Sequence, residues 1–331
     1  MKRLLEALPG VALAALLATA AFLLARLPFV KDTLHVSALL LVILLGMAWR
    51  SLLPVPAPAL PGIRVAQRPI LRWAVAGLGL KLSLGEILHI GGPALTVVVF
   101  STLATLGFGV WIGKRLGMGE KSSMLLAVGS SICGASAVVA ADSVVQGEKQ
   151  DSAVALGVIT LLGTIGIVIY PFIGRSLGMN DFLFGLWSGA SLHEMAQVVA
   201  AGAGFSKRAV EVATVVKLTR ICMLAPIVFG LAWSLRRKGN AGDAKVSLVP
   251  WFLVLFVIFA AINSTGWAPK AALDVLRDID LWLLCVGMAG VGLQTGFHDL
   301  KSAGFAPIAA GALQWVFLAL LSYGLAVALV R

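Results

Sequence analysis

The chain has 331 residues, of which 60% are hydrophobic and 12% are charged, and its mean hydropathy is +0.98. These values exclude an ordinary soluble domain of this length. The net charge of +11 does not indicate nucleic-acid binding, because the basic residues lie in short groups between apolar runs, as they do in the cytoplasmic loops of membrane proteins. We therefore expect an all-α polytopic membrane protein whose partners include the lipid bilayer and no nucleic acid.

Apolar runs between charged or Pro/Gly-rich segments predict about eleven transmembrane helices. In chain order they cover residues 9–26, 34–51, 69–84, 93–114, 122–145, 153–175, 182–202, 208–235, 248–267, 280–296 and 306–330. The proline-rich linker from Pro54 to Pro61 is expected to be non-helical. Lys and Arg are more numerous on the side of the N-terminus, which predicts a cytoplasmic N-terminus and a periplasmic C-terminus in a bacterial inner membrane.

Internal symmetry supports one transporter domain over residues 1–331, with repeat halves at about 34–176 and 182–330. Residues 77–91 match residues 290–304 at an offset of 213, since both read G-x-G-L, then an acid seven residues on, then Gly. The two segments lie an odd number of predicted spans apart, so they run in opposite directions, as inverted repeats require.

A second echo pairs Ser131–Ala141 with Ser191–Ala201 at an offset of 60, through a shared Val-Val-Ala-Ala. It does not fit the same repeat, because the two spans concerned are predicted to be parallel. Either the span count is wrong or this echo reflects composition alone.

The predicted helix over 122–145 contains the small-residue run Gly129–Ala137, which gives a helix little side chain to hold it. We expect the helix to break near Gly134 and to form a binding site from its backbone and from Ser130, Ser131, Cys133 and Ser136. A half-helix that begins there would favour an anion at its N-terminus. The alternative is a close-packed helix seam with no ligand.

Lys217 and Arg220 lie three residues apart in an otherwise largely apolar run, so they share one helix face. A charge at the bilayer centre costs at least about 2.5 kcal/mol, so both side chains need partners. We expect these partners to be carboxylates, most plausibly Glu194, or an anionic solute.

His193 and Glu194 begin an H-E-x-x pattern that ends in Gln197. A zinc metalloprotease would need a second His at that position, so we expect no metal and no enzymatic activity. An intramembrane Glu beside His is better explained as a proton or cation site, and we assign His193, Glu194 and Gln197 to coupling.

Three segments resemble the YeiH-type family of bacterial inner-membrane proteins, which are described as sulfate exporters. They are Gly129–Ala140 (GSSICGASAVVA), Ser191–Ala201 (SLHEMAQVVAA) and Val216–Arg220 (VKLTR). The resemblance extends over nearly the whole chain. It implies a secondary transporter, distantly similar to the bile-acid/sodium symporter group, with two inverted repeats and crossed discontinuous helices.

The function predicted from the sequence is secondary-active transport of a small anion of the sulfate, sulfite or sulfonate class by alternating access. No cofactor is expected, and H⁺ or Na⁺ is the expected coupling ion, because the chain has no G-x-x-x-x-G-K-[ST] nucleotide-binding motif. The alternatives are a passive anion channel, or a transporter of a neutral or cationic metabolite in which Lys217 and Arg220 form structural salt bridges. A homodimer is left open.

Overall fold

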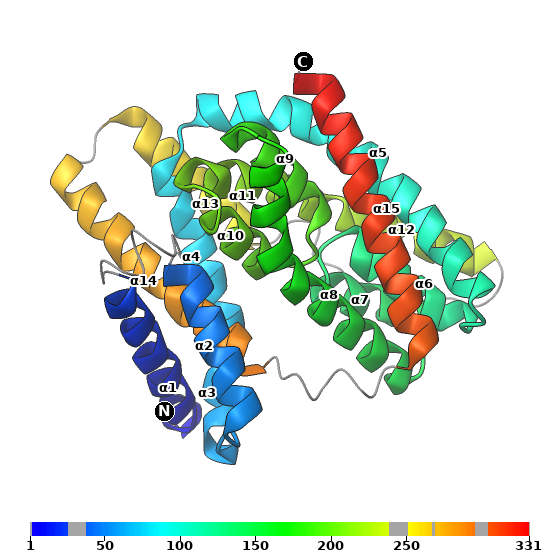
Figure 1. Ribbon diagram of the computed structural model, residues 1–331, viewed down its shortest axis with the longest axis horizontal. Helices are drawn as coiled ribbons and strands as arrows, with labels where there is room; N and C mark the ends of the chain where they lie inside the picture. The colour runs from blue at the N-terminus through cyan, green and yellow to red at the C-terminus, as the bar shows by residue number, and fades with distance from the viewer. Residues whose placement is uncertain (1, 26–37, 238–250, 267–268, 295–303, 331) are drawn as a thin grey trace. The chain divides into compact units, whose positions relative to one another are not determined.

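The computed structural model describes residues 2–25, 38–237, 251–266, 269–294 and 304–330, and the ribbon in Figure 1 shows helices throughout this part of the chain. No β-strand occurs among the described residues. Together with the long apolar helices, this confirms the all-α polytopic membrane fold. The second copy of the 213-residue echo lies partly outside the described residues, and that echo stays a prediction.

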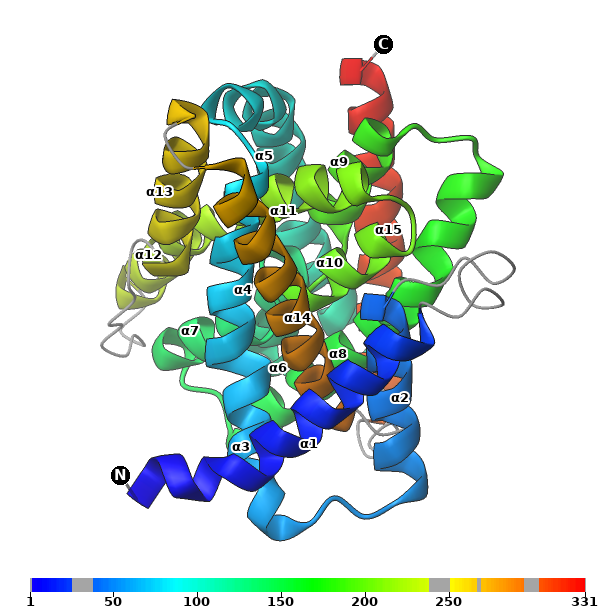
Figure 2. The ribbon, with the colours of Figure 1, turned by 90° about the vertical axis from the view of Figure 1, so that its left-hand side faces the viewer.

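The chain forms two compact units, of which the first comprises residues 1–87, 199–207 and 251–299. Its helical elements are α1 (Lys2–Leu24), α2 (Ala38–Leu52), η2 (Ala57–Ala59), α3 (Leu60–Val65), η3 (Ala66–Ile70), α4 (Leu71–Gly77), η4 (Leu78–Lys81), α13 (Trp251–Thr265) and α14 (Lys270–Gln294). Helix α14 packs against α2, α1 and α4, and α1 also packs against α3. Figures 1 and 2 show α1, α2 and α14 close together.

Glycines allow the helices of this unit to approach closely. A Cβ on Gly10 would lie 1.9 Å from the carbonyl oxygen of Ala59, and one on Gly46 would lie 3.0 Å from the backbone of Gly292. Contacts of this kind are typical of membrane helices, where small residues let backbones meet.

The expectation that Pro54–Pro61 is free of helix is wrong at its C-terminal end. Residues Ala57–Ala59 form a 3₁₀ turn, and α3 begins at Leu60. Pro61 occupies the first turn of α3, where the missing N–H of proline has no intrahelical partner to lose.

The second unit comprises residues 88–198, 208–250 and 300–331. Its helices are α5 (Leu84–Arg115, which begins in the first unit), α6 (Glu120–Ser131), α7 (Ala135–Val145), α8 (Lys149–Ser176), α9 (Asp181–Ser191), α10 (Met195–Ala203, which ends in the first unit), α11 (Lys207–Cys222), α12 (Leu224–Arg237) and α15 (Phe305–Val330). Helix α6 packs against α8, α7 and α15, and α15 also packs against α8 and α9. Glycines of α9 contact α11, since a Cβ on Gly189 would lie 2.6 Å from the carbonyl oxygen of Ala213.

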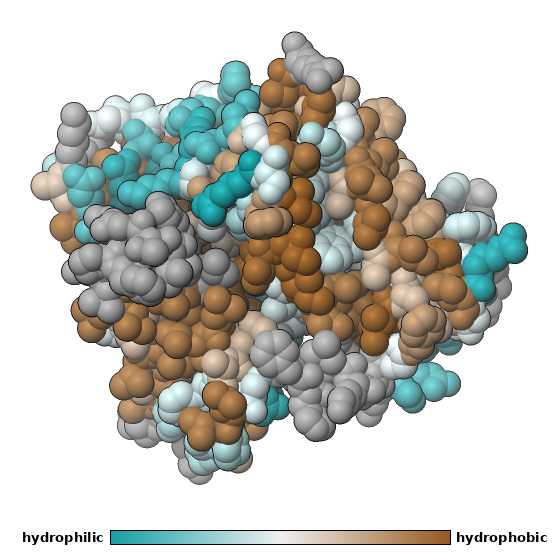
Figure 3. Space-filling model, in the orientation of Figure 1, coloured by the Kyte–Doolittle hydropathy of each residue, from teal (hydrophilic) through white to brown (hydrophobic). Residues whose placement is uncertain are grey.

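Five helical segments in the described part of the chain are long and apolar enough to cross a membrane. They are Glu6–Leu24, Leu84–Arg115, Gln150–Ser176, Lys207–Leu235 and Phe305–Val330. Other predicted spans occur as shorter or interrupted helices, such as Ala135–Val145. Large apolar side chains are exposed on the long helices, and Figure 3 shows the hydrophobic residues of one face in brown.

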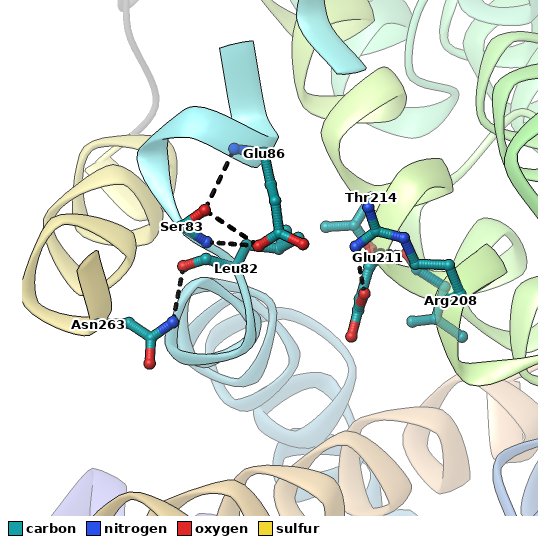
Figure 4. A network of polar contacts seen from close by, with 8 residues as sticks. Leu82, Ser83, Glu86, Arg208, Glu211, Thr214 and Asn263 are labelled. Atoms are coloured by element: carbon teal, nitrogen blue, oxygen red, sulfur yellow. Dashed lines mark hydrogen bonds and ion pairs between the residues drawn. The ribbon is translucent and has the colours of Figure 1, made fainter. Parts of the chain in front are cut away.

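The start of α5 shows how a helix end is satisfied by local sequence. The main-chain N–H of Ser83 donates to Glu86 (2.9 Å) and the N–H of Glu86 donates to the Ser83 hydroxyl (3.2 Å), which is a capping box (Figure 4). The carbonyl of the preceding Leu82 accepts from Asn263 at 3.1 Å. Elsewhere in Figure 4, Arg208 and Glu211 of α11 form an ion pair at 2.8 Å.

Candidate functional site

The predicted break in the fifth span is confirmed. Helix α6 ends at Ser131, helix α7 begins at Ala135, and Gly134 between them has φ 68° and ψ −126°. A residue with a Cβ atom is strained in this conformation, so the break depends on glycine. The N–H of Gly134 returns to the carbonyl of Gly129 at 2.9 Å, which closes the end of α6.

A second break, which the sequence did not predict, divides the seventh span. Helix α9 ends at Ser191 and α10 begins at Met195, so the span expected over 182–202 is not one helix. The intervening residues Leu192, His193 and Glu194 include no glycine. Leu192 leaves the helix in an extended conformation, with φ −74° and ψ 150°.

The two breaks occupy equivalent positions in the 60-residue echo. Ser131 and Ser191 are the last residues of α6 and α9, and Ala135 and Met195 are the first residues of α7 and α10. This correspondence favours a structural origin of the echo over composition alone, and the origin of the echo stays a prediction. The shared sequence marks two helices that are interrupted at the same point.

Lys217 and Arg220 of α11 join the two breaks. Both side chains are fully buried. The Lys217 ammonium donates to the carbonyl oxygens of Ile132 (2.9 Å) and Leu192 (2.7 Å). The Arg220 guanidinium donates to the carbonyl oxygens of Ser131 (2.8 Å), Ser130 (2.6 Å) and Leu192 (3.0 Å).

The hydrogen-bond partners of the two cations are main-chain carbonyl oxygens, which the sequence did not predict, and Glu194 in addition interacts electrostatically with Lys217. A helix ends with carbonyl groups that have no intrahelical partner and with a partial negative charge of about one half. In α6 the carbonyls of Val128 and Gly129 accept N–H groups of the break itself, and the next three carbonyls accept the two side-chain cations. The buried end of α6 is thus satisfied without water.

Glu194 lies against the first break. A Cβ on Gly134 would be 2.6 Å from Cγ of Glu194 and 3.2 Å from its Oε1, so glycine is needed here for space as well as for conformation. Glu194 also interacts electrostatically with Lys217 and with Cys133. The Glu194 side chain of one break therefore lies close to Gly134 of the other.

Gln197 caps the second half-helix. Its side-chain oxygen accepts the main-chain N–H of Glu194 at 2.9 Å, as the third residue of a helix does in a capping box. The H-E-x-x-Q pattern therefore has a structural reason that does not involve zinc. Among the described residues there is no group of three His, Cys, Asp or Glu side chains that could hold a metal ion.

Three buried polar groups at the breaks have no hydrogen-bond partner in the described part of the chain. They are the Ser130 hydroxyl, both ring nitrogens of His193, and the side-chain nitrogen of Gln197. His193 is fully buried, and its ring centroid lies 6.1 Å from that of Trp315. Unsatisfied buried groups are uncommon in native proteins and mark places where a ligand or water is accommodated.

The remaining predicted site residues lie on two sides of the first break. Ser131 is buried and its hydroxyl accepts a hydrogen bond from Gln314 at 3.2 Å. Cys133 is 7% exposed, whereas Ser136 in the first turn of α7 is exposed. The break thus separates a closed interior, which holds the cations, from an accessible start of α7.

Gln314 of α15 forms hydrogen bonds to α5 and α6, although the sequence analysis did not assign it to the site. Its amide nitrogen donates to the carbonyls of Ala127 (3.0 Å) and Thr105 (3.2 Å) as well as to Ser131. Its side chain fills the space that a Cβ on Gly109 would occupy. A glutamine within the apolar run of α15 was the signal that could have identified it.

The fold and these two breaks define a multi-pass α-helical membrane protein whose interrupted helices meet around buried side-chain cations. Residues 9–311 match the family model described as "Conserved hypothetical protein 698", and the chain belongs to this family. This confirms the resemblance to the YeiH-type family.

Relatives described as UPF0324 membrane proteins come from several bacteria. The chain is 34% identical over 301 residues to a UPF0324 membrane protein of Chlorobaculum tepidum, which covers 89% of this chain and 84% of the relative. It is 35% identical over 329 residues to a UPF0324 membrane protein of Bordetella pertussis, and the match covers 97% of this chain and 94% of the relative. It is also 35% identical over 327 residues to one of Pseudomonas aeruginosa, with 95% and 92% covered. These names describe membrane proteins and no catalytic activity.

Proposed function

We propose that the protein is a secondary-active transporter that moves a small anion of the sulfate, sulfite or sulfonate class by alternating access. The anion would bind where the breaks in the fifth and seventh spans meet. The observation that carries this proposal is the burial of Lys217 and Arg220 between two interrupted helices. In membrane transporters, irregular backbone at this depth is tolerated where it lines a binding site.

The charge around the breaks favours an anion. The partial charges of two helix C-termini and two helix N-termini cancel, because each end carries about half a charge. Among the described residues, Glu194 is the carboxylate that interacts electrostatically with Lys217. With Lys217 and Arg220 in their charged forms, about one positive charge remains when Glu194 is ionised and about two when it is protonated. The net charge of these three side chains is therefore positive in both protonation states of Glu194.

Hydrogen-bond donors are also in excess. Lysine has three N–H groups and arginine five, and here they use two and three of them on carbonyl oxygens. The unpartnered Ser130 hydroxyl, His193 ring and Gln197 amide add further donors. A tetrahedral oxyanion accepts several hydrogen bonds at once and suits this surplus.

Glu194 is proposed to couple anion binding to protons. A proton on Glu194 removes one negative charge beside Lys217, so protonation strengthens the attraction for an anion. Anion affinity should therefore rise as the pH falls, and proton and anion should move in the same direction. Sodium remains the alternative coupling ion.

The protein is proposed to lie in the bacterial inner membrane, with a cytoplasmic N-terminus and a periplasmic C-terminus. This proposal is supported by the greater number of Lys and Arg residues on the N-terminal side.

Uptake of radiolabelled sulfate or sulfite into proteoliposomes tests this function, with Ser130→Ala as the informative variant. The Ser130 hydroxyl has no hydrogen-bond partner among the described residues, so its removal should leave stability nearly unchanged and reduce uptake several-fold. Ser152→Ala is the matched control, because it also removes an unpartnered hydroxyl but at the start of α8. Equal uptake by wild type and Ser130→Ala would contradict the proposed site.

The same assay separates the alternatives. Flux that ignores imposed proton and sodium gradients would indicate a passive anion channel. Gradient-driven uptake of a neutral or cationic metabolite, with no uptake of oxyanions, would restrict Lys217 and Arg220 to the structural role that their carbonyl contacts already provide.

A further inference from the structure

Four main-chain carbonyl oxygens gather around the two buried cations. Three come from the end of α6, at Ser130, Ser131 and Ile132, and the fourth comes from Leu192 at the end of α9. The Leu192 oxygen accepts from both Lys217 and Arg220, at 2.7 and 3.0 Å. The two ends are thus held by one shared set of positive charges.

Carbonyl oxygens at the ends of broken helices are the groups with which many membrane transporters bind a coupling Na⁺. A metal cation in such a site neutralises the partial negative charge of the helix ends and holds the two half-helices together. Lys217 and Arg220 do both here with atoms of the chain itself, through five hydrogen bonds of 2.6 to 3.0 Å. A Na⁺ ion would have to compete with two fixed cations for the same oxygens.

We infer that Lys217 and Arg220 are tethered replacements for a coupling metal cation, so that this site binds no Na⁺. One consequence of the inference rests on the proposed transport function, namely that anion movement needs no sodium gradient. The contacts themselves predict a second property. Removal of the Lys217 ammonium leaves the carbonyl oxygens of Ile132 and Leu192 facing a buried vacancy of about the size of a side chain, into which a small free cation fits.

The experiment measures the thermal unfolding midpoint of the full chain in detergent, in sodium, potassium, methylammonium or choline chloride at equal concentration. The wild type should unfold at the same temperature in all four salts. Lys217→Ala should unfold at a lower temperature in choline chloride and recover part of the loss in sodium or methylammonium chloride. Choline is too large to enter the vacancy and serves as the reference cation.

Lys121→Ala is the matched control, because Lys121 also donates to a main-chain carbonyl, that of Gln146, at 2.7 Å, but at an exposed position. Its midpoint should not depend on the cation, since water replaces the lost ammonium. Should Lys217→Ala fail to fold, Lys217→Gln keeps a donor of similar reach and should show a smaller recovery of the same kind.

Two results of the unfolding experiment would overturn the inference. One is a wild-type midpoint that is higher in sodium than in choline chloride, and the other is a Lys217 variant that responds to no cation. The unfolding experiment does not test the proposed transport function, because every salt is a chloride and no oxyanion is present. That function is tested by the uptake assay. Oxyanion uptake that requires a sodium gradient would reject the inference and keep the transporter.

Discussion

The chain satisfies helix ends with arginine in two places, and the two places differ in their access to water. In the first unit, Arg277 donates to the carbonyl of Leu80 at 2.9 Å, where η4 ends, and its side chain is 34% exposed. In the second unit, Arg220 donates to three carbonyls at the broken helices and is fully buried. The Arg277 side chain is therefore partly open to solvent, whereas the Arg220 side chain is enclosed by the protein.

This difference shows which cation the fold depends on. A carbonyl group that loses its partner lowers the stability of the fold little if water can hydrate it. If the group is buried, its loss of hydration is not compensated and the fold is destabilised more. We therefore expect the same chemical contact to contribute little to stability at Arg277 and much more at Arg220.

Arg220→Ala should cost roughly 2 to 5 kcal/mol of unfolding free energy, because it removes three buried hydrogen bonds and leaves three carbonyls unpaired. The measurement is reversible unfolding in mixed micelles. Arg220→Lys should restore part of the loss, since one ammonium reaches fewer oxygens than a guanidinium. A cost below about 1 kcal/mol for Arg220→Ala would show that water enters the breaks.

Gly134→Ala should cost roughly 2 to 4 kcal/mol, because a left-handed conformation disfavours Cβ and the added atom meets Cγ of Glu194 at 2.6 Å. Gly157→Ala in α8 is the matched control, since no atom lies within 4 Å of its added Cβ, and it should be neutral or slightly stabilising. The thermal midpoints of the two variants decide the comparison. Equal midpoints would mean that α6 and α7 form one continuous helix.

Gln197→Met should cost about 1 kcal/mol, because it removes the acceptor for the Glu194 N–H and retains the volume of the side chain. Gln197→Glu keeps an acceptor at the same place and should retain more stability at neutral pH. Hydrogen exchange at the start of α10 provides the measurement. Unchanged protection in Gln197→Met would show that the second break does not need this cap.

Arg277→Ala should cost no more than about 1 kcal/mol, because the Arg277 side chain is 34% exposed and solvent screens the contacts that it makes. The same unfolding assay as for Arg220→Ala measures it. A cost as large as that of Arg220→Ala would abolish the contrast between exposed and buried helix ends.

The two breaks also differ in how far the sequence predicts them. The first break is local, since small residues and Gly134 weaken the helix at the point where it stops. The second has no glycine and is held by the carbonyl of Leu192, which binds side chains 25 and 28 residues further along the chain. Composition cannot reveal such a contact, and only the 60-residue echo carried a sign of it.

The burial of Lys217 and Arg220 on one helix face followed from their spacing in an apolar run, but their partners did not. Sequence analysis treats side chains as the available counter-charges, whereas the structure uses main-chain oxygens that every helix end exposes. The hydrogen bonds of Gln314 could not be predicted for the same reason, because two of its three acceptors are main-chain carbonyl groups.

Selenate, which scatters anomalously and has the shape of sulfate, would test most directly whether the joined breaks hold an anion. The measurement is an anomalous difference map from crystals of the full chain grown with selenate. We predict a selenium peak within hydrogen-bond reach of the Ser130 hydroxyl, beside Lys217 and Arg220. Crystals in which selenium binds only on the outer surface, while the same preparation transports sulfate, would contradict the account.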